Sequence, residues 1–219
     1  MERTRFDRVA GLVFDFDGLI LDSESPGYVA WSEVFTAHGC ALPFEKYSAC
    51  IGTVNGFDLH NYLEQQTGRA IDPKELEDAC TARWLELMRH QPLLPGIADI
   101  LAAAKARGLK LAVASSSTRD WVTGNLHRFG LLERFDAICT RDDVTTVKPD
   151  PALYLLALQR LGITAEQAIA FEDSPNGILA AKRAGLYCIF VPNPLTERLS
   201  GDLADERLKS LEEFRFDRG

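Results

Sequence analysis

Two carboxylates lie two residues apart in the segment Asp15-Phe16-Asp17-Gly18-Leu19. The segment follows a short apolar run, Val9 to Phe14, which predicts a fully buried strand. Because side chains alternate along a strand, Asp15 and Asp17 can point into one small volume. Two anionic groups so close together repel unless a cation, a shared proton or strong hydrogen bonds hold them. The pair points to a divalent metal, although Asp and Gly after a strand are also common in plain turns.

Three more polar clusters follow apolar runs later in the chain. The triplet Ser115-Ser116-Ser117 follows the run Leu109 to Ala114, and the pair Glu172-Asp173 follows Ala168 to Phe171. Lys148 lies between these two clusters and precedes a proline. In an open α/β sheet the ligand binds beyond the carboxyl ends of the strands. The strand ends of such a sheet would gather these acids, serines and the lysine in one place.

This ordered set resembles the haloacid dehalogenase superfamily, in which an Asp-x-Asp segment, a Ser or Thr, a Lys and an acidic pair form four successive motifs. The resemblance covers roughly Val9 to Pro192. The segment Asp15 to Glu24 is most similar to the branch that holds β-phosphoglucomutases and small sugar-phosphate phosphatases. The resemblance implies an α/β fold, with a Rossmann-like doubly wound parallel sheet as its core and an inserted α-helical cap.

Each motif has a role that the resemblance implies. Asp15 is expected to be the nucleophile that attacks phosphorus and forms an aspartyl-phosphate. Asp17 is expected to protonate the leaving oxygen and later to take a proton from water. Mg²⁺ is the expected cofactor, because the candidate ligands are hard oxygens. Its expected ligands are Asp15, the backbone carbonyl of Asp17, Asp173 and, directly or through water, Glu172.

The phosphate is expected to bind at the second and third motifs. Ser115 and Ser116, with the backbone amides that follow, would hold the phosphoryl oxygens at the positive end of a helix. Ser117 fits the N-cap of that helix, in a capping-box pattern with an acid three residues later. Lys148 would neutralise charge on the phosphate and on Asp15.

Strands and helices must position these motifs. Further strands are predicted at Leu109 to Ala114, Ala137 to Cys139, Ala168 to Phe171 and Cys188 to Val191. Apolar stripes at helical spacing occur at Ile97, Ile100, Leu101 and Ala104 and at Leu153, Leu156, Ala157 and Leu161. A helix is predicted to start at Ser174-Pro175, directly after the acidic pair. Strands that alternate with helices predict a doubly wound sheet, and we expect the acidic stretch 201–216 to close its edge.

Between the first strand and Leu93 the pattern is helical, with Trp31, Val34, Phe35 and His38 at helical spacing. We therefore expect a catalytic core of residues 1–23 and 93–219 and an α-helical cap of residues 24–92. Ser23 to Gly27 and Pro92 to Gly96 are expected to form the two hinge segments. The segment 52–56 has a glycine at each end and fits either a specificity loop or a plain turn between helices.

The cap residues bear on which branch of the family the chain resembles. Gly27 stands where the mutases carry a histidine, and Asn55 and Cys80 stand where they carry basic residues that grip a second phosphate. Reorienting a bisphosphate is hard without that grip, whereas transfer to water does not need it. We therefore expect a Mg²⁺-dependent phosphohydrolase that acts on a small phosphomonoester, with a β-phosphoglucomutase-type mutase as the alternative. A phosphorylation-switched receiver domain is disfavoured, because its acidic pair precedes the phosphoacceptor.

Composition excludes several other classes. The 219 residues carry a net charge of -8 with a pI near 5.1, which argues against nucleic acid as a partner. No run approaches the roughly 20 apolar residues that span a bilayer, and the first residues lack an apolar signal region. The odd number of scattered cysteines predicts free thiols. We expect a cytoplasmic protein with a small phosphate ester as its partner, and a swinging cap suits a monomer.

Overall fold

A six-stranded parallel sheet forms the centre of the computed structural model, which describes residues 8–53 and 56–216. The strands are β1 (Gly11–Phe14), β2 (Lys110–Ala114), β3 (Ala137–Cys139), β4 (Ala168–Glu172), β5 (Tyr187–Phe190) and β6 (Glu206–Arg207). They lie in the order β3-β2-β1-β4-β5-β6, and each neighbouring pair is parallel. This strand order defines a doubly wound sheet, so the predicted fold class is confirmed.

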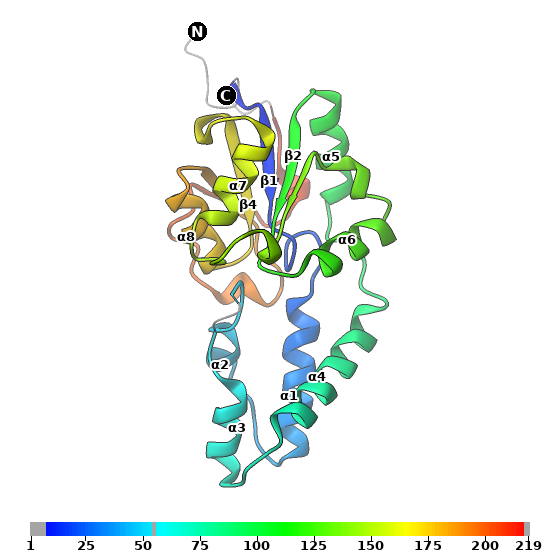
Figure 1. Cartoon of the computed structure of the whole chain (residues 1–219), viewed down its shortest axis with the longest axis vertical. Coiled ribbons are helices and arrows are strands. Elements are labelled where there is room, and N and C mark those ends of the chain that lie inside the picture. Colours follow the sequence, from blue (N-terminus) through cyan, green and yellow to red (C-terminus); the bar gives the residue numbers. More distant parts are fainter. Residues whose placement is uncertain (1–7, 54–55, 217–219) are drawn as a thin grey trace.

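Helices flank the sheet and also form a second body beyond one end of it (Figure 1). The helices of the second body are α1 (Glu24–Ala37), α2 (Phe44–Ser48), α3 (Leu59–Thr67) and α4 (Pro73–Met88). The helices beside the sheet are α5 (Ile97–Ala106), α6 (Arg119–Arg128), α7 (Ala152–Leu161) and α8 (Pro175–Arg183). Short 3₁₀ turns occur at Leu132–Arg134, Arg141–Asp143, Ala165–Gln167, Thr196–Arg198 and Leu211–Glu213. Within the described ranges, no helix is long and apolar enough to cross a membrane.

The middle of the sheet is the point where the order of the strands reverses. β1 pairs with β2 on one side and with β4 on the other, and Phe14 is aligned with Phe171. Asp15 and Glu172 therefore come side by side at the carboxyl ends of adjacent strands, with Ser115 just beyond the end of β2. Connections that leave this point in opposite directions open a crevice, where doubly wound sheets bind their ligands.

The two faces of the sheet bury different side chains. One face carries large residues, such as Leu12, Phe14 and Phe171, against α5 and α6. The other face carries small residues, such as Ala112 and Ala170, against α7 and α8. Since strand residues alternate between faces, each central strand contributes to both layers. The apolar stripes predicted on α5 and α7 are buried, with only Leu156 less than fully so.

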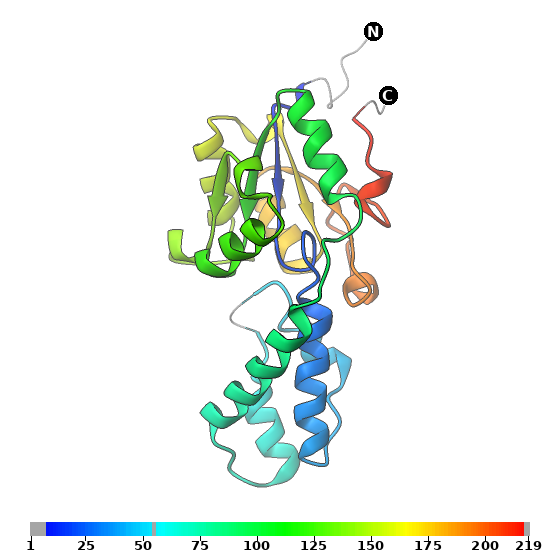
Figure 2. The ribbon, with the colours of Figure 1, turned by 90° about the vertical axis from the view of Figure 1, so that its right-hand side faces the viewer.

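The helices α1 to α4 have a hydrophobic cluster of their own. It consists of Phe35, Leu42, Tyr47, Ile51, Leu59, Leu63 and Leu76. Figure 2 shows α1 and α4 side by side, joined to the sheet layer by two chain segments. These segments meet, because Leu21 and Leu93 form a β-bridge and Leu94 N donates to Ile20 O at 3.0 Å. The predicted absence of strands between β1 and Leu93 holds for the residues that the structure describes.

One hinge prediction is wrong and the prediction for the sheet edge is confirmed. Residues 24–27 form the first turn of α1 and Ser23 is its N-cap, so Ser23 to Gly27 is not a linker. Pro26 is tolerated because a first turn needs no N–H from it. Gly27 lies under Tyr47, whose Oη would be 2.3 Å from a Cβ at this position. At the other end of the chain, β6 pairs with β5 and closes the sheet edge.

Candidate active site

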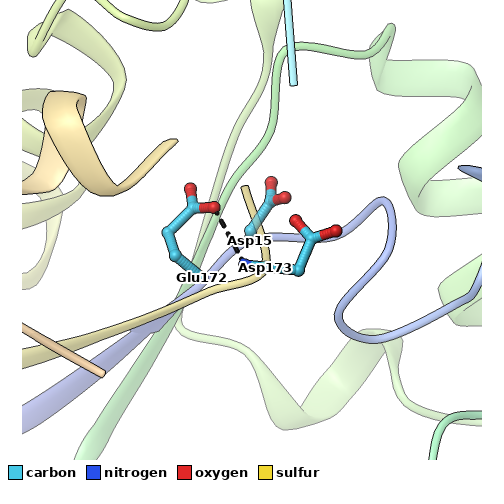
Figure 3. A group of neighbouring side chains, drawn as sticks. All are labelled: Asp15, Glu172 and Asp173. Atoms are coloured by element: carbon cyan, nitrogen blue, oxygen red, sulfur yellow. Dashed lines mark hydrogen bonds between the residues drawn. The ribbon is translucent and has the colours of Figure 1, made fainter. Parts of the chain in front are cut away.

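Three carboxylates converge at the carboxyl ends of β1 and β4 (Figure 3). One oxygen from each of Asp15, Glu172 and Asp173 lies within 4.8 Å of the others, and all three residues are buried. This donor set suits Mg²⁺, which uses few carboxylates and takes its other oxygens from water and substrate phosphate. The side chain of Asp17 is not part of this group as the structure describes it. Only its backbone carbonyl remains a candidate ligand.

The carboxylate cluster is a poor environment for negative charge. Burial raises the pKa of Asp15 to about 7, with Glu172 and Asp17 adding to the shift and Lys148 opposing it. Burial also raises the pKa of Asp173 well above its ordinary value, and Asp15 and Glu172 add to that shift. Asp173 Oδ1 is buried without a hydrogen-bond partner among the described residues. Buried polar atoms are nearly always paired, so this oxygen fits a ligand for a divalent cation.

Asn193, which no sequence motif marks, holds the other oxygen of Asp173. Its Nδ2 donates to Asp173 Oδ2 at 2.8 Å and to Gly18 O at 3.1 Å. Gly18 has a φ of 82°, and a Cβ there would lie 2.0 Å from Asp173 Oδ2. Only glycine lets the loop after β1 come this close. Asn193 follows the end of β5, so the strand-end rule that marks the other polar residues could also have found it.

Replacing Asn193 by alanine is expected to weaken Mg²⁺ binding by about 10- to 100-fold, the usual effect of removing a group that orients a metal ligand. Isothermal titration calorimetry of the metal-free protein with MgCl₂ measures this affinity. Thr196→Val is the matched control, because it removes the hydroxyl that accepts from Asn193 N at 3.0 Å and leaves Asp173 untouched. Equal Mg²⁺ affinity in Asn193→Ala and the wild type would show that Asn193 does not orient Asp173.

Lys148 is 2% exposed and lies between two of the carboxylates. Its Nζ donates to Asp15 Oδ1 and to Glu172 Oε1, each at 2.6 Å. Burial alone would lower the pKa of Lys148, but the two carboxylates raise it above its ordinary value, so the ammonium stays charged. Tyr154 OH donates to the same oxygen of Glu172 at 2.5 Å. Tyr154 lies among the buried residues of α7. An apolar stripe at helical spacing predicts that such a residue is buried, but not that its hydroxyl contacts the site.

The side chain of Asp17 accepts four hydrogen bonds from residues in the described part of the chain. Ser23 Oγ and Trp121 Nε1 donate to Asp17 Oδ1, each at 2.8 Å. Ser115 Oγ at 3.2 Å and Ser117 Oγ at 2.7 Å donate to Asp17 Oδ2. Donors on both oxygens hold the carboxyl group of Asp17 in one orientation.

Ser117 is therefore a site residue, and the prediction that it caps a helix is wrong. The N-cap of α6 is Thr118, whose hydroxyl accepts a backbone N–H of the first turn at 3.3 Å. Serine and threonine are both favoured at the N-cap, and although only Ser117 has an acid three residues later, the cap shifts by one position to Thr118 and frees Ser117 to reach Asp17. The Ser115 hydroxyl donates a hydrogen bond to Asp17 Oδ2 and accepts one from Ser117 N. Ser116 Oγ is buried without a partner in the described chain, and Ser116 lines the site.

A cavity of about 310 Å³ lies between the carboxyl edge of the sheet and the inserted helices. Its lining from the sheet side and the loop after β1 is Asp15, Asp17, Ser23, Ser116, Ser117 and Lys148. Its lining from the inserted segment is Glu24, Gly27, Trp31, Tyr47, Cys50, Gly52, Thr53, Cys80, Thr81 and Trp84. Asn176 Nδ2 donates to Ile51 O at 2.9 Å, so this segment contacts the start of α8. Gly52 and Thr53 thus lie over the site, whereas Val54 and Asn55 lie outside the described residues.

This fold and site define a doubly wound α/β protein with a helical insertion and a cluster of buried carboxylates at its strand ends. The family model for haloacid dehalogenase-like hydrolases matches residues 12–191, and the chain belongs to this family. It is 45% identical to the protein YhcW of Bacillus subtilis over 94% of both chains. It is 30% identical to hexitol phosphatase B of Escherichia coli, over 94% of this chain and 95% of that one. The crystal structure of CbbY from Rhodobacter sphaeroides in complex with phosphate is similar, with a TM-score of 0.76 at 34% identity over 94% of this chain and 96% of that one. The chain is an enzyme, a hydrolase of the phosphatase type, as predicted.

Proposed function

We propose that the protein is a Mg²⁺-dependent phosphohydrolase that removes phosphate from a small monoester, such as a sugar or polyol phosphate, through an aspartyl-phosphate on Asp15. The observation that carries the proposal is the buried cluster of Asp15, Glu172 and Asp173, in which one oxygen of Asp173 lacks a partner among the described residues and Lys148 lies alongside. Phosphoryl transfer depends chiefly on positioned positive charge. A cation in the cluster and the Lys148 ammonium would supply it.

Asp15 is the proposed nucleophile, because it lines the cavity and Lys148 holds its Oδ1. The bond between an Asp15 oxygen and phosphorus forms as the bond between phosphorus and the ester oxygen breaks. Bound Mg²⁺ would offset the negative charge of the phosphoryl oxygens. Ser116 would donate to a phosphoryl oxygen, since its hydroxyl has no other partner in the described chain and Ser116 lines the cavity.

Asp17 is the proposed acid and base. Its side chain lines the same cavity as Asp15 but stands outside the carboxylate cluster, so it need not bind a cation and would protonate the ester oxygen. After the alcohol departs, Asp17 would take a proton from the water that attacks the aspartyl-phosphate. Lys148 would keep the leaving carboxylate of Asp15 paired in this second step.

The cavity supports a substrate with one phosphate and a neutral, hydroxylated leaving group. Its volume suits a small molecule, and Lys148 is the one cation in its described lining. Glu24 faces it from α1, and burial raises the pKa of Glu24 to about 8, with Asp17 and Asp15 adding to the shift. A carboxyl group with a pKa this high is largely neutral near pH 7 and can donate a hydrogen bond to a hydroxyl, whereas a second phosphate or a carboxylate would find no cation beside Glu24 in the described lining. The indoles of Trp31 and Trp84 provide apolar faces. Hexitol phosphatase B, a relative, is named for a polyol phosphate.

We further propose that residues 24–92 act as a cap over a core of residues 1–23 and 93–219. The separate hydrophobic cluster of the inserted helices and the meeting of the two connecting segments at Leu21 and Leu93 support this division. Closure of such a lid would exclude water during phosphoryl transfer and select the leaving group.

A β-phosphoglucomutase-type mutase is the second candidate. Such an enzyme must hold a second phosphate opposite Lys148, and the described lining of the cavity has no further cation there. Gly27 stands where β-phosphoglucomutases carry a histidine, and the Tyr47 side chain fills the space that a side chain at this position would need. Both observations favour transfer to water.

Release of inorganic phosphate from a panel of phosphomonoesters, with and without MgCl₂, tests the proposal. We expect Mg²⁺-dependent release from sugar or polyol monophosphates and slower release from phosphoglycolate, whose leaving group is anionic. β-Glucose 1-phosphate belongs in the panel, with glucose 6-phosphate measured beside free phosphate. Conversion to glucose 6-phosphate without phosphate release would favour the mutase, and release that does not need Mg²⁺ would contradict the cation site.

A further inference from the structure

The loop after β1 is linked to the inserted helices through a pair of tryptophans. Trp121 of α6 and Trp84 of α4 pack with their ring centroids 4.5 Å apart and an interplanar angle of 37°. Trp121 Nε1 donates to Asp17 Oδ1 at 2.8 Å, and Trp84 Nε1 donates to the backbone oxygen of Ser23 at 3.0 Å. Ser23 Oγ in turn donates to Asp17 Oδ1. Both partners of Asp17 Oδ1 are therefore in contact with Trp84.

The donors on the two oxygens of Asp17 are chemically different. A serine hydroxyl can donate or accept, but an indole N–H can only donate. Asp17 Oδ1, which faces Trp121 Nε1, must therefore remain an acceptor as long as that hydrogen bond exists. Among the described residues, the hydrogen-bond partners of Asp17 Oδ2 are the hydroxyls of Ser115 and Ser117, and a hydroxyl can turn to accept. A protonated carboxyl oxygen is a poor acceptor, so the hydrogen bond from Trp121 disfavours a proton on Oδ1 and makes Oδ2 the preferred oxygen for it.

We propose that Trp121 is a positioning residue that keeps Asp17 Oδ1 as an acceptor, directs the transferable proton to Oδ2, and is itself held in place by Trp84 of the inserted helices. This rests on the proposed function. In the first step an Asp15 oxygen bonds to phosphorus and the phosphorus–ester bond breaks. The electron pair of that bond goes to the ester oxygen, which takes the proton from Asp17 Oδ2.

Other contacts keep α6 and α4 together at this point. Arg128 of α6 donates to Met88 O at 3.1 Å and to Gln91 O at 2.7 Å, at the end of α4. Both tryptophans pack against the larger hydrophobic cluster of the sheet layer, not against the cluster within α1 to α4. Figure 1 shows this end of α4 reaching towards α6. The packing of Trp84 against Trp121 thus links the position of α4 to the orientation of the Asp17 side chain.

Trp121→Phe is the decisive variant, because it keeps an aromatic ring against Trp84 and removes only the N–H that faces Asp17. A misplaced acid slows esters with poor leaving groups most, since a good leaving group departs without a proton. The measurement is kcat/KM, which ends at departure of the alcohol, for the best sugar or polyol monophosphate and for p-nitrophenyl phosphate. We expect Trp121→Phe to lose at least about 10-fold on the alkyl ester, a part of the 10²- to 10⁴-fold that acid–base catalysis contributes. On p-nitrophenyl phosphate we expect a loss of less than about 3-fold. Asp17→Asn provides the reference for complete loss of the acid.

The contribution of Trp84 is tested in the same assay by two substitutions. Trp84→Ala removes the ring that supports Trp121. Like Trp121→Phe, it should lower the ratio of kcat/KM on the alkyl ester to kcat/KM on p-nitrophenyl phosphate. Trp84→Phe restores an aromatic ring and should recover most of that ratio. Circular dichroism and thermal unfolding establish that each variant is folded.

Four results would overturn the inference. An equal loss on both esters in Trp121→Phe would make Trp121 a purely structural residue, and so would no loss on either. If Trp121→Phe does not fold, an unchanged ratio in Trp84→Ala would overturn the link to the inserted helices and with it the proposal. A wild-type enzyme that hydrolyses neither ester with Mg²⁺ would overturn the proposed function and this inference together, which distinguishes the two failures.

Discussion

Asp15→Asn is expected to lower kcat by at least about 10⁴-fold and to leave the fold intact. An amide is too weak a nucleophile to form the aspartyl-phosphate, and removal of one member of a catalytic unit abolishes most of the catalysis of that unit. The fold should persist, because the substitution is isosteric and removes one negative charge from a cluster of three buried acids. Lys148 keeps its contact with Glu172. Phosphate release in the presence of Mg²⁺ and thermal unfolding of both proteins measure the two effects.

Asp58→Asn is the matched control for this substitution. Asp58 is exposed, caps α3 by accepting from Asn61 N at 2.9 Å, and lies outside the cavity lining. Asparagine caps helices about as well, so activity and stability should both stay close to the wild type. Activity retained in Asp15→Asn would place the nucleophile on another residue.

Lys148→Met is expected to reduce both stability and activity strongly. The substitution leaves Asp15 and Glu172 buried without their common cation, and breaking a buried ion pair from one side typically costs about 3 to 5 kcal/mol of unfolding free energy. Denaturant unfolding without metal measures this loss. Added Mg²⁺ should recover part of it, because a ligand that binds only the native state stabilises that state. Turnover should remain low even when the protein is folded, since Lys148 also offsets charge on the phosphoryl group.

Lys182→Met controls for the removal of a lysine as such. Lys182 pairs with Asp205 on the surface, where each side chain is about a third exposed, and such pairs contribute at most about 1 kcal/mol. A Lys148→Met protein as stable as Lys182→Met would show that the buried carboxylates do not depend on Lys148. Stability that does not respond to Mg²⁺ would count against a cation among those carboxylates.

The sequence predicts the gathering of Asp15, Lys148, Glu172 and Asp173 because the rule behind the prediction is general. Parallel strands end at one edge, and the buried apolar runs locate the strands with little ambiguity. The same logic predicts the strand ends and the stripes of α5 and α7. The assigned roles in catalysis remain proposals, since proximity alone does not identify a nucleophile.

The residues that hold these groups in place are less accessible to sequence reasoning. Trp121 reaches Asp17 from a helix face and Tyr154 reaches Glu172 from an apolar stripe, and each contact joins residues far apart in the chain. Local patterns contain no information on such distances. Ser117 shows a second difficulty, because two adjacent residues are of a type favoured at N-caps and the local pattern, with an acid three residues after Ser117, favours the one that does not cap α6. The positions that orient a site are thus less predictable than the positions that carry its charge.

The bridge between Leu21 and Leu93 has a further consequence, for how an insertion can grow. The chain leaves the sheet layer and returns to it at almost the same point, because these two residues pair directly. Closing a loop whose ends already meet becomes harder only slowly with length, by about 0.6 kcal/mol for each doubling. Helices could therefore be added to residues 22–92 one at a time without disturbing the order in which the strands of the parent sheet come together. The inserted helices bury a hydrophobic cluster of their own, and this burial would offset the small entropic cost of the longer loop. Lineages of this architecture can thus vary the inserted helices widely while the sheet beneath them stays the same.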